Sequence, residues 1–422
     1  MSDSRARRGL ATLLTAGALS NTGTTMTAIA VPWFVLATTG SATRAGVAAF
    51  VSLAPVVISA VFGGAIVDRL GHRRSSVISD LASGLLTAAI PALFLTTGLG
   101  FAPLLIMLFG RWLLTGPGET ARRALVPALA VSGNVRMERA TAAFDAVSRG
   151  ARMAGAPLAG LLIAAFGATR LGPVALLLID AATFLASSLL IGCGVPSAGY
   201  RAGERDADGY LARLREGLAF LWRDRLLRAI TLMILVANML STGRSQVLLP
   251  VYAREVLGDP RGLGLMLGLT GGGAMVGALA YGMVGHRLPR RPTYAVCFLL
   301  ATVPGMFVLA VRPPFAVILG TLTVCGVLSG ALNPLLGVVE FERIPARLRA
   351  RVLGAADAGA YAGMPLGGLL AGALTGWLGL TWALFAFAGA LTIICLPPFF
   401  GTVWRDLDAA PQPAVAAEMI SP

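Results

Sequence analysis

The chain has 422 residues, of which 56% are hydrophobic and 13% are charged, and its mean hydropathy is +0.78. A soluble globular domain carries about 25% charged residues, so a water-soluble fold is excluded and lipid is the expected solvent. The net charge of +14 lies almost wholly between apolar runs, which indicates membrane topology and excludes a nucleic-acid partner.

The sequence contains no lysine. A P-loop needs Gly-Lys-Ser/Thr and Schiff-base chemistry needs a lysine amine, so ATP hydrolysis and Schiff-base catalysis are excluded. The cysteines lie in apolar stretches without CxxC spacing, which supports neither a metal site nor a disulfide framework. We expect no cofactor, no metal and no enzymatic activity. The cysteines are Cys193, Cys297, Cys325 and Cys395.

Apolar runs of membrane-spanning length follow one another along the chain. A spanning helix needs about 20 apolar residues, and we count about twelve such runs. The first run follows Arg5, Arg7 and Arg8 but is too long for a signal peptide, so we expect it to be a retained helix. The expected spans are residues 11–37, 45–67, 76–98, 102–119, 145–166, 172–194, 227–251, 263–286, 293–312, 315–338, 353–376 and 380–403.

The arginines alternate between the loops that join these runs. If both termini are inside, 27 of the 34 arginines fall in cytoplasmic segments, five fall in outer loops, and two, Arg111 and Arg244, lie within helices. Because positive loops stay in the cytoplasm, this pattern predicts that both termini are cytoplasmic.

The expected domains follow from the longest polar stretch, which lies near the middle of the chain. Residues 1–196 form a six-helix bundle, and 197–226 form a cytoplasmic linker with an amphipathic interfacial helix over Tyr210–Trp222. Residues 227–405 form a second six-helix bundle, and 406–422 form an Ala/Pro-rich disordered tail.

The two halves resemble each other in sequence. The only two histidines, His72 and His286, also fall in corresponding loops. We therefore predict an all-α membrane protein of two pseudo-symmetric bundles, an architecture of transporters that bind substrate between the halves. Aligned pairs are Arg139 with Arg351, Asp145 with Asp357, Gly155 with Gly367, and Gly160 with Gly372.

One loop is specific enough to indicate a family. Residues 64–74 read Gly-Ala-Ile-Val-Asp-Arg-Leu-Gly-His-Arg-Arg, which resembles the signature loop between helices two and three of the major facilitator superfamily. Segments 80–81, 121–127, 249–255, 342–345 and 349–352, with Asp180, resemble the drug-exporter branch that includes macrolide-efflux and enterobactin-export proteins. The resemblance implies a monomer whose bundles rock about a central cavity. The gating loop residues are Gly64, Asp68, Arg69, Gly71, His72, Arg73 and Arg74.

Three positions depart from the family pattern. His72 stands where the family usually carries arginine; a histidine titrates near neutrality, so a pH-sensing role and plain tolerance both stay open. Pro157 stands one place later than the family's helix-five Gly-Pro. The segment from Arg111 to Gly118 carries one residue more than the family's Arg-x-x-x-Gly, which weakens any role transferred to Arg111.

Charges inside apolar runs are expensive and face a partner or the bundle interior. Arg111 and Asp180 lie near mid-depth in the first half, so we expect that they either pair or each meet a separate polar partner. Proton coupling needs a buried carboxylate, and the candidates in order are Asp180, Glu119 and Asp80. Arg244 either attracts an anionic group of the substrate or extends its head outward.

Charges at the inner helix ends are expected to form a cytoplasmic latch that includes Asp68 and Arg73. Asp145 and Arg149 lie four apart on one helix face and are expected to pair there, with Arg351 and Asp357 as latch residues of the second half. Polar or bulky residues of helices one and seven are candidates for the cavity lining. They are Asn21, Thr25, Met26, Asn238, Met239 and Gln246.

These features predict a secondary active transporter in the bacterial cytoplasmic membrane, exporting a drug-like, macrolide-like or siderophore-like molecule in exchange for protons. An importer or uniporter of a small metabolite is the alternative. A strongly polar cavity would favour it, and the sequence does not show one. A membrane enzyme or scaffold is a third class. An enzyme of this kind would cluster His, Cys or acidic residues at one membrane face, and no such cluster is seen.

Overall fold

The computed structural model describes residues 3–166, 172–196, 210–345 and 348–408, and every regular element among them is a helix. The chain divides into two compact units. The first comprises Met1–Glu204 together with Ala253–Gly264, and the second comprises Arg205–Tyr252 together with Leu265–Pro422. The expected linker residues 197–209 and the expected tail residues 409–422 lie outside the described residues.

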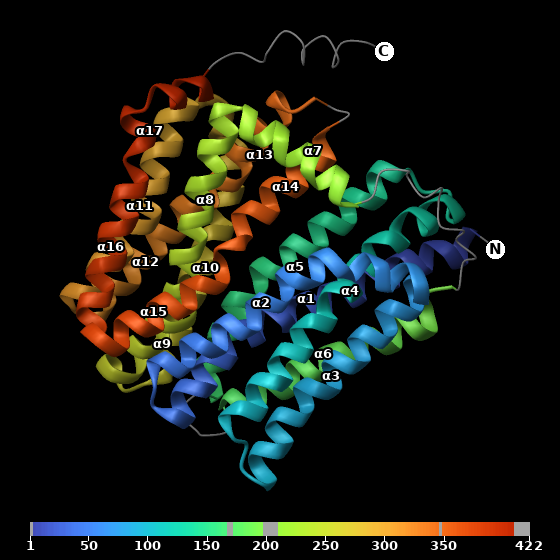
Figure 1. Cartoon of the computed structure of the whole chain (residues 1–422), viewed down its shortest axis with the longest axis horizontal. Coiled ribbons are helices and arrows are strands. Elements are labelled where there is room, and N and C mark those ends of the chain that lie inside the picture. Colours follow the sequence, from blue (N-terminus) through green and yellow to red (C-terminus); the bar gives the residue numbers. More distant parts are fainter. Residues whose placement is uncertain (1–2, 167–171, 197–209, 346–347, 409–422) are drawn as a thin grey trace. The chain divides into compact units, whose positions relative to one another are not determined.

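Six long helices build the first unit, coloured blue to green in Figure 1. Helix α1 packs along α5 and α6, and α3 packs between α4 and α6. Residues 253–264 join this unit because Arg254 donates a hydrogen bond to the carbonyl of Leu36, near the C-terminus of α1. The helices are α1 (Asp3–Thr39), α2 (Ala42–Leu70), α3 (His72–Thr96), α4 (Phe101–Ser132), α5 (Met137–Phe166) and α6 (Gly172–Gly194).

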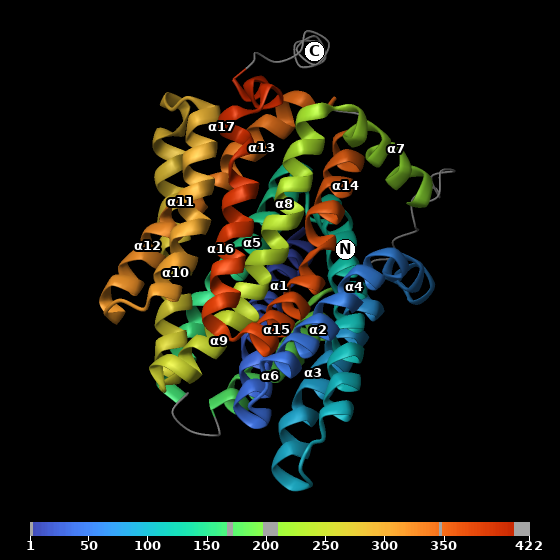
Figure 2. The ribbon, with the colours of Figure 1, turned by 60° about the vertical axis from the view of Figure 1, so that its left-hand side comes forward.

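The second half of the chain is divided into shorter helices. Helix α11 packs side by side with α12 and α16, and α8 packs against α15 (Figure 2). The helices are α7 (Tyr210–Arg223), α8 (Arg225–Gly243), α9 (Leu249–Tyr252), α10 (Pro260–Val284), α11 (Arg290–Val311), α12 (Phe315–Gly330), α13 (Leu332–Arg343), α14 (Arg349–Ala362), α15 (Met364–Leu378), α16 (Leu380–Cys395) and α17 (Pro397–Phe400). Two 3₁₀ turns, Gly285–Arg287 and Thr402–Leu407, complete it.

Several expected spans are wrong in their limits. The fourth continues to Ser132, well past residue 119, because the charge of Arg122 is paired inside the bundle and does not end the helix. The seventh is interrupted by a π-helical turn at Arg244–Leu248, and a second such turn follows its expected end, at Ala253–Leu257. The tenth and eleventh each divide into two helices, at Ala331 and Gly363 respectively. Hydropathy alone does not register such changes in the backbone hydrogen-bond pattern.

The expected tail also begins too early. The first residues after 405 are held to the second unit, because Asp406 lies 3.7 Å from Arg343 and Asp408 accepts a hydrogen bond from the backbone N–H of Arg291 at 3.0 Å. The amphipathic segment forms α7 as expected, extending to Arg223.

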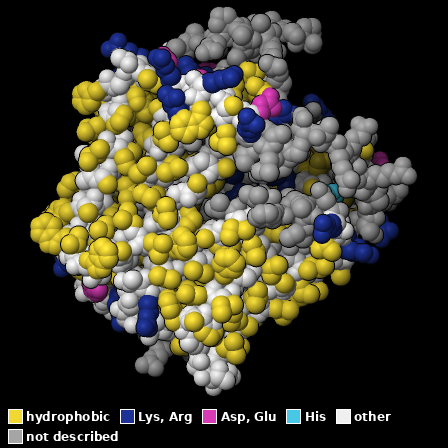
Figure 3. Space-filling model, in the orientation of Figure 1, with side chains coloured by type: hydrophobic (Ala, Val, Ile, Leu, Met, Phe, Trp, Pro, Cys, Tyr) yellow, Lys and Arg dark blue, Asp and Glu magenta, His cyan; other side chains and the backbone are white. Residues whose placement is uncertain are grey.

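Eight of the described helices are long and apolar enough to cross a membrane. Large apolar side chains are exposed on their outer faces, among them Leu85 (56%), Ile106 (73%) and Leu279 (66%). Hydrophobic side chains cover much of the described surface visible in Figure 3. A face of this kind is stable against lipid and not against water.

Glycines allow helix backbones to touch in the second unit. Gly273 and Gly277 of α10 lie against Thr323 and Val327 of α12, and Gly326 and Gly330 of α12 return the contact toward α10. Small residues four apart on both helices permit the close approach on which membrane helices depend, because lipid supplies no hydrophobic driving force between helices.

Candidate functional site

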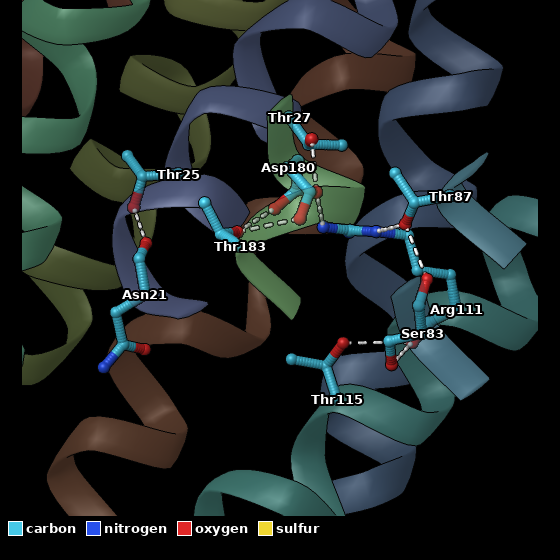
Figure 4. Close-up of polar contacts among 9 residues, drawn as sticks. All are labelled: Asn21, Thr25, Thr27, Ser83, Thr87, Arg111, Thr115, Asp180 and Thr183. Carbon is cyan, nitrogen blue, oxygen red and sulfur yellow. Dashed lines mark hydrogen bonds and ion pairs between the residues drawn. The ribbon is translucent and has the colours of Figure 1, made fainter. Parts of the chain in front are cut away.

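The interior of the first unit holds a fully buried ion pair. Nη2 of Arg111 on α4 lies 2.5 Å from Oδ2 of Asp180 on α6, and both side chains are 0% exposed (Figure 4). The contact that their similar depth suggested is therefore present. A charge without a partner is costly in this environment, so each group stabilises the ionised form of the other.

Hydroxyl groups complete the surroundings of this pair. Thr27 of α1 donates to Oδ2 of Asp180 at 2.5 Å, and Nε of Arg111 donates to Oγ1 of Thr87 on α3 at 2.9 Å (Figure 4). The guanidinium also lies against the rings of Trp112 and Phe184. Four helices thus meet at one carboxylate and one guanidinium.

A glycine makes room for the carboxylate. A Cβ placed on Gly23 of α1 would overlap Oδ1 of Asp180 and the hydroxyl of Thr183. The absence of a side chain at this position lets α1 approach α6 closely enough for Thr27 to reach Asp180. Gly23 is therefore part of the site. Glycine is common in such helices, so the sequence alone did not single out this one.

A second buried pair lies further along α4. Nη1 of Arg122 is 2.7 Å from Oδ1 and 2.9 Å from Oδ2 of Asp80 on α3, and Ser187 of α6 donates to Oδ2 at 2.6 Å. The side chains of Arg122 and Asp80 are 2% and 1% exposed. Sequence reasoning assigned Arg122 to a cytoplasmic loop, and the structure corrects this because Asp80 compensates its charge.

The spacing on α4 relates the two pairs. Arg111 and Arg122 are eleven residues apart, which is about three helical turns, so they lie on one face roughly 16 Å apart. Asp180 and Ser187 on α6 are seven apart and match the same two levels, as do Thr87 and Asp80 on α3. This eleven-residue spacing was the available signal for the second pair.

The remaining acidic candidates lie nearer the surface. Glu119 pairs with Arg152 at 2.9 Å, and these side chains are 35% and 45% exposed. The expected local pairing of Asp145 with Arg149 is wrong among the described residues, because Asp145 lies 3.6 Å from Arg123 of α4 instead. A neighbouring helix approaches Asp145 more closely than the next turn of its own helix does.

The signature loop turns sharply between α2 and α3. Gly71 has φ of +80°, a conformation that L side chains rarely adopt, and it ends α2 and precedes α3. Arg73 donates to the carbonyls of Ile191 and Gly192 at the C-terminal end of α6. The side chain of Asp68 lies outside the described part of the structure, so its place in the expected latch stays a prediction. Arg69 and Arg74 are exposed, and His72 is half-buried.

The latch candidates of the second unit are only partly placed. Arg351 forms an ion pair with Glu216 of α7, and Gly217 lies directly against the carbonyl of Arg351. Asp357 lies on α14 and is exposed. Helix α7 is therefore held along α14 rather than free, and the role of these residues as a latch stays a prediction.

Arg244 lies inside the second unit. Its Nη1 would be 3.6 Å from a Cβ on Gly305 of α11, and its side chain lies near Cys325 of α12. No described carboxylate stands within ion-pair distance of Arg244, in contrast to Arg111. Its expected role with substrate stays a prediction.

Some of the residues expected to line the cavity are buried, and others take part in contacts within or between helices. Asn21 and Met26 of α1 are buried, and Thr25 donates to the carbonyl of Asn21 (Figure 4). Asn238 donates to the carbonyl of Ala360 at 3.1 Å, which joins α8 to α14. Met239 and Gln246 lie on the same stretch as Asn238, Met239 partly exposed and Gln246 buried.

A family model described as the Major Facilitator Superfamily matches residues 13–260 and 237–419 of the chain. The chain belongs to the Major Facilitator Superfamily. The fold and the family that the signature loop predicted are confirmed, and this superfamily member is a multi-pass membrane transporter.

Curated relatives place it in the drug-exporter branch. The multidrug efflux pump Tap of Mycolicibacterium fortuitum is 32% identical over 409 residues, covering 95% of this chain and 96% of the relative. The pump of the same name from Mycobacterium tuberculosis H37Rv is 33% identical over 406 residues, covering 95% of each chain. The predicted resemblance to drug exporters is thereby confirmed.

Solved structures agree in fold. The nucleoside transporter NupG has a TM-score of 0.70 at 12% identity, covering 92% of this chain and 98% of that one. A bacterial homologue of the lysosomal transporter Spinster has a TM-score of 0.72 at 14% identity, covering 98% and 100%. At these identities the likeness shows the shared fold alone.

Proposed function

We propose that this superfamily member exports drug-like compounds in exchange for protons, and that Asp180 carries the coupling proton. The observation that carries the proposal is the buried pair of Asp180 with Arg111 at 2.5 Å. The relatives that carry the name multidrug efflux pump support the substrate class. A carboxylate sealed from water with one cationic partner has two distinct states, ionised and paired or protonated and unpaired.

Protonation changes the bonding between four helices. A proton that binds an oxygen of Asp180 neutralises the carboxylate, which weakens its bond to Nη2 of Arg111 and its acceptance from Thr27. The ties from α6 to α4 and to α1 then loosen together. Such a change shifts an inward–outward equilibrium only if the proton binds the two states with different affinity, and the ion pair supplies that difference.

We further propose that the chain spans the bilayer about twelve times as a monomer with both termini in the cytoplasm. The distribution of arginines supports this orientation. Residues 1–196 and 227–405 then act as the two rocking bundles, and residues 197–226 act as the linker between them. A single cysteine placed at residue 203 of a cysteine-free chain should react with a membrane-impermeant maleimide from the inside only, and one placed at Gly258 from the outside only.

Proteoliposomes test the coupling directly. Ethidium efflux should accelerate when the imposed pH gradient drives protons opposite to the drug and slow when the gradient is reversed. Asp180→Asn should abolish this response, whereas Asp259→Asn, in an exposed loop, should retain it. If gradients of either sign leave wild-type ethidium movement unchanged, proton coupling is wrong.

A further inference from the structure

The buried face of α3 is polar. Its lipid-exposed face carries Ile78, Leu81 and Leu85, at 50%, 43% and 56% exposure. Apart from Gly84, the residues that turn inward over almost four turns are hydroxyl-bearing or acidic. They are Ser75, Ser76, Ser79, Asp80, Ser83 and Thr87.

This polar face joins the two ion pairs. Thr87 lies at the level of Arg111 and Asp180, and Asp80 lies at the level of Arg122, about 10 Å away along α3. Ser83 lies between the two levels and is 0% exposed. From Asp80 the serines continue toward the N-terminal end of α3 at His72, so the polar face covers the whole distance from Asp180 to that end.

Helices α1 and α6 add hydroxyls at the same levels. The two helices run antiparallel, because Gly23 faces Thr183 while Thr12 faces Gly194. Ser20 of α1 therefore falls beside Ser187 of α6, at the level of the second ion pair. Both are buried, at 1% and 0% exposure, and Ser187 donates to Asp80.

Three of these hydroxyls have no hydrogen-bond partner among the residues that the structure describes. Many hydroxyls in the helices of this unit bond to the carbonyl four residues earlier, as Ser52 does to Ala48. The hydroxyls of Ser20, Ser75 and Ser76 are buried and make no such bond. Buried polar groups of native proteins are satisfied by protein or by bound water, so these three oxygens are sites for water inside the bundle.

We propose that the hydroxyl-lined interior between α1, α3 and α6 is the route by which protons leave Asp180 toward the N-terminal end of α3. The inference rests on the proposed proton coupling and on the proposed orientation, in which that end faces the cytoplasm. The carboxylic acid of Asp180 gives its proton to water held by the serines and becomes a carboxylate that pairs with Arg111 again. The water chain then returns to its neutral state by losing a proton to the bulk at the N-terminal end of α3.

The charged groups beside this route are few. Asp180 faces Arg111 from α4, and Asp80 faces Arg122 from α4; Thr27 and Ser187 are the polar neighbours from α1 and α6. His72 and Arg73 lie at its N-terminal end. A guanidinium whose carboxylate is neutralised repels a hydronium ion, so the ion pair of Asp80 with Arg122 keeps the middle of the route passable.

Proteoliposomes that contain a pH-sensitive dye test the proposal. Proton movement is measured while ethidium is transported down its gradient, and ethidium/ethidium exchange is measured at equal pH because it needs no net proton transfer. The triple variant Ser20→Ala, Ser76→Ala, Ser83→Ala should slow coupled proton movement about tenfold while exchange stays within about twofold of wild type. The matched control is Ser52→Ala, which removes a buried hydroxyl that bonds to its own helix, and it should change neither rate.

Two results overturn the proposal. The first is a triple variant whose coupled proton movement equals that of wild type, and the second is a parallel fall in both rates, which marks a general structural defect. Wild-type protein that transports ethidium down its gradient without moving protons would refute the coupling itself, so failure of the route and failure of the proposed function give different results.

Discussion

Gly367 of α15 lies directly against the backbone of Met239 in α8, so that any Cβ at this position would overlap the Met239 carbonyl oxygen. Its sequence counterpart in the first unit, Gly155 of α5, makes the equivalent contact with α1, where a Cβ would be 2.6 Å from Cβ of Thr25. The same crossing is thus built twice, once in each unit, and its glycines are the ones that the alignment of the two halves paired.

The first prediction concerns this crossing. Gly367→Ala should lower the stability of the folded protein by about 1–3 kcal/mol, because a carbonyl on a packed helix cannot move aside as a flexible side chain can. Thermal unfolding of purified protein in detergent measures it. The control is Gly389→Ala in α16, where a Cβ meets nothing within 4 Å, and it should leave stability unchanged or raise it slightly.

The second prediction concerns the buried ion pair. Asp180→Ala should destabilise the protein by about 3–5 kcal/mol, because it leaves the guanidinium of Arg111 buried without a counter-charge. Replacing both, as Arg111→Met with Asp180→Leu, should recover most of that loss while coupled transport stays absent. Asp145→Ala, which breaks an exposed pair with Arg123, should cost less than about 1 kcal/mol. A double variant no more stable than Asp180→Ala would contradict this account.

The third prediction separates a helix cap from an ion pair. Asp224 precedes α8, and its Oδ1 accepts from the backbone N–H groups of Leu226 and Leu227, while Arg343 donates to both of its oxygens. Asp224→Asn keeps the cap and loses the charge, whereas Asp224→Ala loses both. The alanine variant should therefore be less stable than the asparagine variant by about 1 kcal/mol, the contribution of the cap. Thermal unfolding measures this as a lower midpoint for the alanine variant. Equal midpoints for the two variants would show that the cap contributes nothing.

The fourth prediction concerns arginines that bond to helix ends. Arg73 donates to carbonyls at the end of α6, and Arg291 donates to the carbonyls of Pro398 and Phe399 after α16. Because the last carbonyls of a helix have no partner within it, Arg73→Ala should raise hydrogen exchange over residues 190–196, and Arg291→Ala over 397–401. Arg74→Ala, at an exposed position, should leave both segments unchanged. Protection that stays intact in Arg73→Ala would show that α6 ends stably without it.

Composition and pattern determined the class of this protein. An apolar chain with arginines gathered in alternate loops has lipid as its only suitable solvent, and lipid permits helices because they satisfy their own backbone groups. The signature loop with Gly71 indicated the superfamily, and the similar depths of Arg111 and Asp180 anticipated their pairing.

Only the tertiary structure decided which polar groups meet. Arg122 and Asp80 are 42 residues apart, and Thr27 and Asp180 are 153 apart; no local pattern relates residues across such distances. Asp145 likewise bonds to a neighbouring helix and not to its own next turn. Helix periodicity assigns a residue to a face of its helix. Which residues that face meets depends on how closely the neighbouring helices approach. Small residues such as Gly23 and Gly367 set that approach through packing.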